Sequence, residues 1–563
     1  MRSGADPSWD RVARLAIALG AVARALWALF LHLPVDHVYS DAQSYVESAM
    51  RLAKWAAPVR FDAFYPPGTQ VVLAVPLALI GADRDGLLAA AIVWTILSAI
   101  TPLFVWRYTL LVLSRPAAAL ATVLCAAWPI HIAYTGYFMS ETPGMAFLVL
   151  SLWLAERARR ERGIMSGLGA GLAGGFAAVT RPAFVLNVLL GAVPLVRARA
   201  LVRPAIALAA GVLLMLALAV VHNSLVVGQL SGISENSGLT FYLGHCDVHA
   251  VRTTRSDGIT YVFATPVATQ LDRGADVTFA ERDIWDERFF YSEGLRCIAN
   301  DGLSHARILL RNVFDMGLST VPWPPSNDPG VREVVSLANI LYVLALPFVV
   351  LGSVRLVRRR WPEGGGRGEL MLLGQLALVL VTAVVFLGDP RFRTPYDVFG
   401  LALLGSLIAD RFVVARSAAA ASSHPDVRAD DGVEQDGERV LGRSEPSREV
   451  DADQASAAES DRAPAVRADD DAAQHGRTLE GDEAVPAEEL GRVRPRVHEV
   501  PPVGPAAVEP EITSDAQPVL AAGLASRSGD APDRGAGDED AAGVAPAGDR
   551  SGEEVHPASF DER

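Results

Sequence analysis

Long apolar runs, separated by shorter polar segments, recur over the first 412 residues of this chain. An α-helix needs about 20 predominantly apolar residues to cross the hydrocarbon core of a bilayer. Runs near this length predict ten spans, so we expect an all-α polytopic membrane protein. The predicted spans cover residues 15–33, 87–106, 116–134, 144–157, 164–180, 183–197, 203–221, 334–354, 369–387 and 395–412.

A shorter apolar run, residues 69–82, follows Tyr65-Pro66-Pro67-Gly68. Its length of about 14 residues favours a re-entrant or interfacial helix over a full span. If this run does not cross, residues 34–86 form a first outer loop, and every basic cluster between spans lies on one side, the cytoplasmic side. These clusters are Arg107 with Arg115, residues 157–162, Arg197 with Arg199 and Arg203, and Arg355 with residues 358–360.

The two ends of the chain differ sharply in composition. Residues 1–14 are polar and carry three arginines, which favours a cytoplasmic N-terminus before an uncleaved first span. Residues 417–563 hold 34 acidic residues and 14 arginines, and Phe560 is the single aromatic residue among them. Such a segment buries too little apolar surface to offset chain entropy, so we expect a disordered acidic tail in the cytoplasm.

The chain as a whole is 51% hydrophobic, and its net charge of −14 comes from the tail, because residues 1–416 carry a net charge of +6. The predicted organisation is an N-terminus (1–14), a first membrane module (15–221), an outer lobe (222–333), C-terminal transmembrane helices (334–416) and the tail (417–563). A fixed-period repeat, a phosphate-binding glycine loop, a zinc-type Cys/His spacing and a Gly-x-Ser-x-Gly elbow are all missing from the sequence.

The outer lobe contains two of the three cysteines, Cys246 and Cys297, whereas Cys125 lies in an apolar run and is expected to be a small buried residue. If the lobe faces an oxidising compartment, a disulfide between Cys246 and Cys297 is expected. We therefore predict a small lobe of mixed structure, braced by this bond. A glycine-rich stretch at residues 167–175 lies within an apolar run and predicts close packing of helices.

On this topology four polar clusters meet at the outer membrane face. Each has a simpler explanation: Glu141 as an acid at a helix N-terminus, Arg181 reaching towards lipid headgroups, and the later arginines binding anionic lipid. Together they combine carboxylates that can act as a base or metal ligand with guanidiniums that can hold a phosphate. The clusters are Asp41 with Tyr45, residues 140–143, Arg181-Pro182, and Gly388-Asp389-Pro390-Arg391-Phe392-Arg393.

These motifs, in this order, resemble the GT-C glycosyltransferases that use polyprenyl-phosphate sugars, including protein O-mannosyltransferases and the aminoarabinose transferase of lipid A. The resemblance covers roughly residues 10–412. It also includes Tyr65-Pro66-Pro67-Gly68, Thr180-Arg181-Pro182, and the segments 222–228 and 233–244. In this family an acidic residue in the first outer loop is essential and a second acidic motif follows in the next outer loop, which implies roles for Asp41 and Glu141. The family often has an Asp-Glu pair in the first loop, whereas Ala42 follows Asp41 here, and this leaves the class of acceptor open.

The resemblance implies an inverting displacement on a polyprenyl-phosphate sugar at the outer face of the cytoplasmic membrane, with Asp41 as the base. Arg391 and Arg393 are predicted to bind the leaving phosphate, with Arg181 as the second choice, because a guanidinium holds two oxygens at once. Glu141 is expected to bind either a divalent cation or a sugar hydroxyl. The aromatic residues expected to line the sugar or prenyl groove are Tyr45, Tyr65, Tyr137 and Tyr396.

Two other classes of function are compatible with the pattern. A transporter or lipid flippase also places charges near spans, although alternating access favours sites near the bilayer midplane and an inverted repeat. The other class is a non-catalytic scaffold protein that recruits partners through its acidic tail. The expected partners are a lipid-linked sugar donor and a protein, lipid or glycan acceptor, and nucleic acid is not expected.

Overall fold

The computed structural model of this protein describes residues 7–196, 199–248, 250–254, 260–264, 277–280, 282–318 and 329–423. The predicted disorder of the tail falls outside these residues from residue 424 onward. Residues 417–423 are described, and they continue the last helix beyond its predicted end. The described chain is mainly helical, which confirms the predicted fold class.

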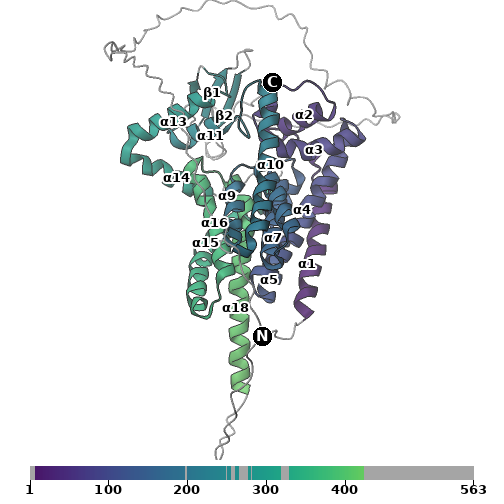
Figure 1. The fold of residues 1–563 in the computed structure, drawn as a ribbon, viewed down its shortest axis with the longest axis vertical. Coiled ribbons are helices and arrows are strands. Elements are labelled where there is room, and N and C mark those ends of the chain that lie inside the picture. Colours follow the sequence, from purple (N-terminus) through teal and green to yellow (C-terminus); the bar gives the residue numbers. More distant parts are fainter. Residues whose placement is uncertain are drawn as a thin grey trace, which may run out of the picture. The chain divides into compact units, whose positions relative to one another are not determined.

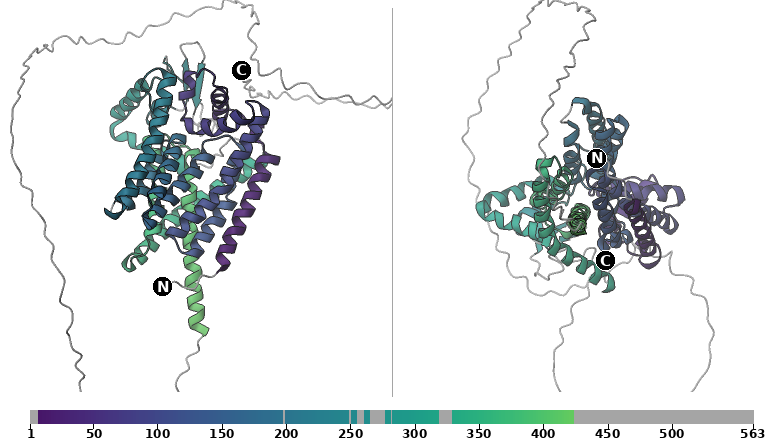
Figure 2. Two further views of the ribbon diagram at one scale, coloured as in Figure 1. Left: turned by 45° about the vertical axis from the view of Figure 1, so that its right-hand side comes forward. Right: turned by 90° about the horizontal axis from the view of Figure 1, so that it is seen from below.

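Within the described residues, each of the ten predicted spans coincides with a helix, and the helices run side by side in one bundle (Figure 1). Viewed from below, the last helix, α18, is seen end on among the others (Figure 2). The bundle helices are α1 (Pro7–Leu26), α4 (Arg84–Val112), α5 (Arg115–Ala127), α7 (Glu141–Glu161), α8 (Ile164–Thr180), α9 (Phe184–Val196), α10 (Val202–Val227), α15 (Pro329–Arg360), α16 (Arg367–Val385) and α18 (Asp397–Ser423).

Five helices in the described part of the chain are long and apolar enough to cross a membrane, and a sixth span results if α5 and the short helix after it are joined. The five are Ser8–Leu31, Arg84–Val112, Arg199–Val227, Gly330–Arg360 and Arg367–Val385. α8 and α9 are shorter apolar helices. The protein is therefore a multi-pass membrane protein, while the count of ten spans stays a prediction.

The span that begins with α5 is broken by a bend of 49° before α6 (Pro129–Ala133). Pro129 has no amide to donate, so carbonyls at the end of α5 lose their helical partners. The guanidinium of Arg24, which is 1% exposed, donates to the carbonyls of Ala126 at 2.7 Å and Cys125 at 3.2 Å. The break is therefore stabilised by an arginine of the neighbouring helix α1.

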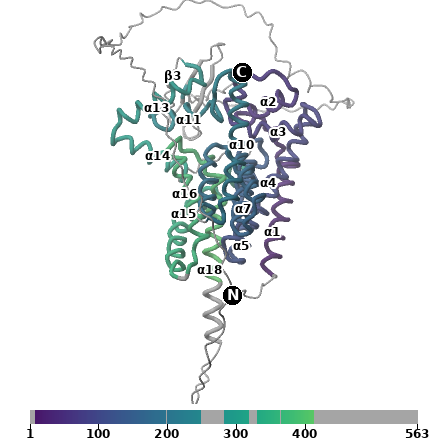
Figure 3. Tube along the Cα trace, in the orientation of Figure 1, coloured from purple at the N-terminus to yellow at the C-terminus, as the bar shows by residue number. Residues whose placement is uncertain are grey.

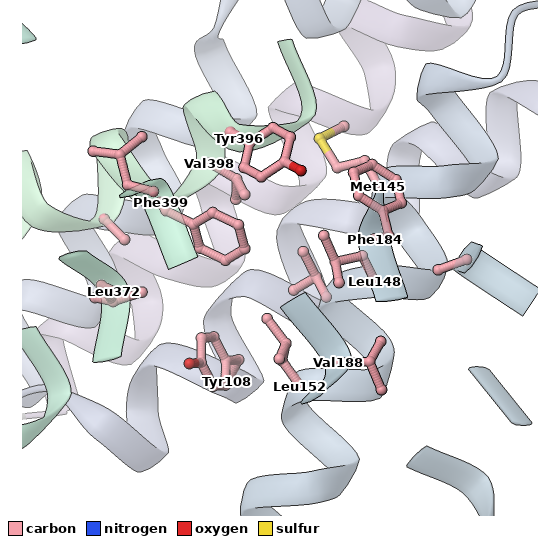
Figure 4. Packing of buried hydrophobic residues seen from close by; sticks show 14 of the residues in the cluster. Tyr108, Met145, Leu148, Leu152, Phe184, Val188, Leu372, Tyr396, Val398 and Phe399 are labelled. Carbon is pink, nitrogen blue, oxygen red and sulfur yellow. The ribbon is translucent and has the colours of Figure 1, made fainter. Parts of the chain in front are cut away.

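Buried side chains of α4, α7, α9, α16 and α18 pack together in the main core (Figure 4). Phe184 at the start of α9 packs against Tyr396, with ring centroids 5.9 Å apart. On α8, a Cβ at Gly167 or Gly171 would collide with the backbone of α10. This confirms the close helix packing that the glycine-rich stretch predicts.

The first outer loop lies at the same end of the bundle as the outer lobe (Figures 1 and 3). It contains η2 (Pro34–Asp36), α2 (Asp41–Ala53), η3 (Arg60–Ala63) and α3 (Pro67–Ile80). α3 begins at a proline and has 14 residues, as the short apolar run predicts. Its predicted re-entrant position in the bilayer stays a prediction.

A buried carboxylate fastens this loop. Asp62, which is 4% exposed, accepts hydrogen bonds from Ser48 at 2.6 Å, from Arg51 at 2.5 Å and from the backbone amide of Val59 at 2.9 Å. These donors hold the pKa of Asp62 below its ordinary value despite burial. The end of α2 is thereby tied to η3, two residues before Tyr65.

The outer lobe combines helices with a small sheet, in agreement with the expected mixed structure. The strand order is β2-β1-β3, with β1 antiparallel to β2 and parallel to β3. A disulfide joins Cys246 to Cys297, the expected pair, with Cα atoms 5.4 Å apart. The lobe elements are α11 (Ser237–His245), β1 (Ala250–Thr254), β2 (Thr260–Ala264), β3 (Val277–Ala280), α13 (Glu287–Asp301), η6 (Gly302–His305) and α14 (Ala306–Leu318).

The remaining short turns connect the bundle helices. They are η1 (Trp27–Leu31), η4 (Tyr134–Gly136), η5 (Arg199–Leu201), η7 (Trp361–Glu363), α17 (Pro390–Arg393) and η8 (Thr394–Tyr396). Two of them matter for the site: η4 leads into Glu141, and α17 carries Arg391.

Candidate active site

Asp41 is the first residue of α2, at the outer end of the bundle. Ser40 before it has a φ of 54°, a conformation that costs a non-glycine residue about 1–2 kcal/mol. The Asp41 side chain is 21% exposed, and its Oδ1 accepts a hydrogen bond from the Tyr65 hydroxyl at 2.7 Å. Its Oδ2 is paired with the Nη1 of Arg391.

Arg391 connects the two carboxylates that the sequence singles out. It lies on α17, and its Nε donates to Oε1 of Glu141 while its Nη1 donates to Asp41. Glu141 begins α7 and is 2% exposed. One buried guanidinium thus bridges two acids that are 100 residues apart in the sequence. Arg391 follows Glu141 by 250 residues and Asp41 by 350.

Arg181 reaches the same carboxylate from the turn between α8 and α9. Its Nη1 lies 2.6 Å from Oε1 of Glu141 and 3.2 Å from the Ser140 hydroxyl. Its guanidinium carbon lies 5.1 Å from the centroid of the Phe392 ring, within range of a cation–π contact. Two arginines and two acids therefore form one buried network, which satisfies the requirement that buried charges be paired.

Asp389 adds a third carboxylate beside this network. Its Oδ1 accepts the backbone amide of Arg391 at 2.8 Å and so caps α17. Asp389 is 3% exposed, and burial raises its pKa to about 6. Asp389 therefore gains its negative charge near pH 6, where an ordinary aspartate is already fully ionised.

Tyr45 and Tyr65 lie next to Asp41 with their ring centroids 5.1 Å apart. Burial and the nearby Asp41 carboxylate raise the pKa of Tyr45 to about 12 and also raise the pKa of Tyr65. Both phenols are neutral near pH 7, and the Tyr65 hydroxyl donates its proton to Asp41.

These side chains line a cavity of about 430 Å³, which we call the first cavity. Its wall combines the charged network with apolar residues from α9, α11 and the end of α16. A cavity of this kind suits a ligand that has both a charged group and an apolar part. Lining residues include Asp41, Tyr45, Tyr65, Arg181, Asp389, Arg391, Phe184, Leu239, Leu243, Phe386, Leu387, Phe392 and Tyr396.

Arg393 does not join this network. It is 1% exposed, and its nitrogens lie 3.2 Å from Asp397 and 2.5 Å from Asn339. Two residues along a helical turn differ by about 200° in direction, so Arg391 and Arg393 point to opposite sides. Arg393 is absent from the residues that line the first cavity, so this position does not support its predicted role in phosphate binding, which stays a prediction.

The predicted aromatic residues divide in a similar way. Tyr45, Tyr65 and Tyr396 line the first cavity. Tyr137 instead packs against His32, with ring centroids 4.6 Å apart, in the core below the first outer loop.

The donor set does not fit a divalent cation. Among the described residues, no group of three or more His, Cys, Asp or Glu side chains is placed to hold a metal ion. Asp41 and Glu141 are both paired with Arg391, so a guanidinium already balances their charges.

Several lining residues were not assigned from the sequence. Asp389 belongs to a segment whose arginines drew attention, although an acid before Pro390 is a recognisable helix cap. Asn236 and Ser237 lie in a segment that the family resemblance includes, but no chemistry was assigned to them. Glu287, which accepts a hydrogen bond from Ser237, belongs to the outer lobe, where no motif indicates it.

Comparison with known proteins supports the predicted resemblance. Residues 65–224 match the family model described as dolichyl-phosphate-mannose-protein mannosyltransferase. This match supports the predicted resemblance over residues 65–224. The matched range contains Tyr65, Glu141 and Arg181, while Asp41 and Arg391 lie outside it. No curated protein matches the chain in sequence.

Solved structures similar to this chain include the oligosaccharyltransferase of Archaeoglobus fulgidus. Its apo form is 13% identical, with a TM-score of 0.41, and covers 73% of this chain and 52% of that chain. Its complex with an inhibitory peptide and a dolichol-phosphate is 13% identical, with a TM-score of 0.43, and covers 74% and 52%. Its complex with Zn and sulfate is 14% identical, with a TM-score of 0.40, and covers 71% and 49%. This chain thus spans about half the length of these structures.

Proposed function

We propose that this chain transfers a sugar from a polyprenyl-phosphate donor to an acceptor hydroxyl, on the outer face of the cytoplasmic membrane. The observation that carries the proposal is the bridge that Arg391 makes between Asp41 and Glu141 in the wall of a partly apolar cavity. A lipid-linked sugar phosphate has the matching features, namely an anionic group, a polar sugar and an apolar chain. The family match over residues 65–224 supports the same class of donor.

The reaction is an inverting displacement in which Asp41 is the base. Each of its two oxygens already accepts one hydrogen bond, and each has a second lone pair for an acceptor hydroxyl. Asp41 takes the hydroxyl proton as the acceptor oxygen bonds to the anomeric carbon. The bond between that carbon and the phosphate oxygen breaks, and the phosphate leaves with the bonding electrons.

Arg391 and Arg181 serve the leaving group. Negative charge on the phosphate grows as the bond breaks, so guanidiniums that are already in place stabilise the transition state more than the bound donor. Their pairing with Glu141 fixes both guanidiniums before the donor binds, which removes the cost of reorganising them. Glu141 is then a positioning residue, and Tyr65 orients Asp41 through its hydroxyl.

A donor panel tests this proposal. The purified full-length protein is incubated with polyprenyl-phosphate mannose, glucose, arabinose and aminoarabinose together with native membrane extract, and release of the lipid phosphate and labelled product are measured together. We expect one donor to be consumed with stoichiometric transfer of its sugar. A well-folded preparation that turns over none of the donors, but moves a lipid-linked sugar across proteoliposomes, contradicts the proposal and indicates a transporter or flippase.

A further inference from the structure

A second cavity adjoins the first on the side of the outer lobe. Its volume is about 780 Å³, and its wall is formed by the segment after α10, by Arg60 of the first outer loop and by the residues around the start of α13. Gly232 and Glu287 line both cavities, so the two meet at these residues. The proposed reaction uses the first cavity and assigns nothing to the second.

A glycine, Gly232, lies where the two cavities meet. Gly232 is exposed, and a Cβ at this position would meet only the carbonyl of Ser234, at 3.6 Å. The carbonyl of Gly232 accepts a hydrogen bond from Asn223, whose side chain is buried, at 3.1 Å. The backbone is therefore held in place, and a larger side chain here would project into open space rather than into packed atoms.

The wall of the second cavity is polar almost throughout. Of its thirteen residues, only Leu230 and Gly232 lack a polar side-chain atom. A peptide with apolar side chains would bury them here without apolar partners, whereas a polyhydroxylated ligand finds a donor or acceptor on most sides.

The charges of this wall nearly balance. Three arginines face four carboxylates, so the cavity has no strong preference for an anion or a cation. The Arg60 guanidinium pairs with Glu235 at 3.3 Å and lies 4.9 Å from the centroid of the Trp285 ring. Planar polar groups such as guanidinium and carboxylate match pairs of neighbouring hydroxyls, because each presents two donors or two acceptors at once.

We propose that the second cavity is an acceptor subsite for a neutral carbohydrate chain, whose terminal hydroxyl reaches the first cavity past Gly232. This inference rests on the proposed glycosyl transfer. It specifies the acceptor as a glycan. An acceptor that enters from the lobe side leaves the apolar wall of the first cavity to the donor lipid.

The first experiment measures binding without any donor. Neutral trisaccharides of mannose, galactose and arabinose, and a neutral peptide that contains Ser and Thr, are titrated against the full-length protein by saturation-transfer NMR. At least one trisaccharide is expected to bind. Arg288→Ala, at an exposed residue of the second cavity, is expected to weaken this binding by about tenfold or more. Arg296→Ala is the matched control, because Arg296 is 69% exposed on the same helix, and it should change binding by less than about twofold.

Binding of the peptide but of no trisaccharide would overturn the proposal in favour of a protein acceptor. Trisaccharide binding that Arg288→Ala and Arg296→Ala affect equally would also overturn it, because the ligand would then lie elsewhere.

The second experiment separates this inference from the proposed function. Gly232→Leu should lower transfer to the trisaccharide by about tenfold or more, because a leucine at the point where the two cavities meet obstructs the acceptor chain. Gly330→Leu is the control, since a Cβ at Gly330 meets no atom within 4 Å. Trisaccharide binding with no donor turned over by wild type contradicts the proposed function alone. Normal transfer by Gly232→Leu contradicts the proposal that the acceptor reaches the first cavity past Gly232.

Discussion

At the scale of single residues, Arg391 holds the candidate site together. It is largely buried, and it pairs with one acid from the first outer loop and another from α7. A buried charge is tolerated only when it is paired and hydrogen-bonded. The same pairing presents a rigid guanidinium at the wall of the first cavity, where the proposed reaction needs one.

Arg391→Lys tests this role. A lysine keeps the positive charge but offers one ammonium in place of a planar fork, so it cannot hold Asp41 and Glu141 together and also bind a phosphate. We expect kcat/KM for the donor to fall by about a hundredfold, measured as initial rates of lipid phosphate release. Arg296→Lys, at an exposed position of α13, is the control. Equal rates for the two variants would show that Arg391 does not act on the donor.

The raised pKa of Asp389, about 6, leads to a prediction for pH dependence. Below this pH Asp389 is mostly neutral, and above it the carboxylate is charged and repels the phosphate of the donor, which stays anionic throughout. The KM for the donor should therefore rise as pH increases through about 6. The free energy of unfolding should also fall as pH rises from the ordinary Asp range to about pH 6. In this range the folded state keeps the proton on Asp389, whereas the unfolded state has already lost it.

Asp389→Asn should flatten both profiles. The measurements are donor KM from about pH 5 to pH 8 and thermal unfolding from about pH 3.5 to pH 8. If the variant keeps the wild-type dependence of KM on pH, the titrating group is a different one.

The charged residues of the site were predictable where their position next to a predicted span was enough to place them. Asp41, Glu141, Arg181 and Arg391 each follow or precede a helix on the same predicted face, and the structure brings all four together. The sequence places Arg393 beside Arg391, whereas the helical turn directs it towards Asp397 and away from the first cavity. Asp389 was named in the same cluster but given no role, although an acid before Pro390 is a recognisable helix cap.

At the scale of elements, the site depends on how α3 and the first outer loop lie against α8. A Cβ at Gly68, in the first turn of α3, would lie 2.5 Å from the Thr180 hydroxyl and 2.8 Å from the carbonyl of Val179. Thr180 immediately precedes Arg181, and Gly68 follows Tyr65 by three residues. The close approach at Gly68 therefore sets the spacing between both sides of the cavity.

Gly68→Ala should increase that spacing. The added methyl meets backbone atoms that cannot move away, so α3 must shift and carry Tyr65 away from Asp41. We expect a loss of stability of about 1–3 kcal/mol, measured by thermal unfolding, together with a loss of transfer of at least about tenfold. Gly330→Ala, at a position with open space around it, should change neither quantity. A normal transfer rate in Gly68→Ala would show that the contact between α3 and α8 does not set the geometry of the site.

The helices were predictable from hydropathy, because a bilayer requires long apolar segments that satisfy their own backbone hydrogen bonds. Pro129 marks the break between α5 and α6 in the sequence, whereas its stabilisation by Arg24 from another helix was not predictable. The strands of the lobe were not predictable either. Strand pairing joins residues that are distant in the sequence, such as Val251 and Thr278. The segments that contain them do not alternate strongly between apolar and polar residues, so the sequence gives no clear signal for strands.

At the scale of the whole molecule, the acidic charge and the candidate site belong to different parts of the chain. The residues that form the site lie between Asp41 and Tyr396, whereas the segment 417–563 carries a net charge of −20. A chain shortened to residues 1–423 keeps every described residue of both cavities.

The shortened chain should therefore transfer sugar at a rate within about twofold of the full chain, since a segment of this composition buries little apolar surface. The measurement is the initial rate of transfer by both proteins at equal amounts of folded enzyme. A complete loss of transfer, with an unchanged melting temperature, would instead support a role of the tail in recruiting partners.

The most direct test of the account compares Asp41→Asn with Asp36→Asn in the transfer assay. Asp36 lies in the same outer loop, and its side chain is 51% exposed in a pair with Arg84 at 3.1 Å, so its loss should cost little. Asp41→Asn should lower kcat by about 10²–10⁴-fold in a protein that still folds, because the amide keeps the shape of the side chain but cannot take a proton. Near-normal turnover by Asp41→Asn would contradict the assignment of the base and with it the proposed mechanism.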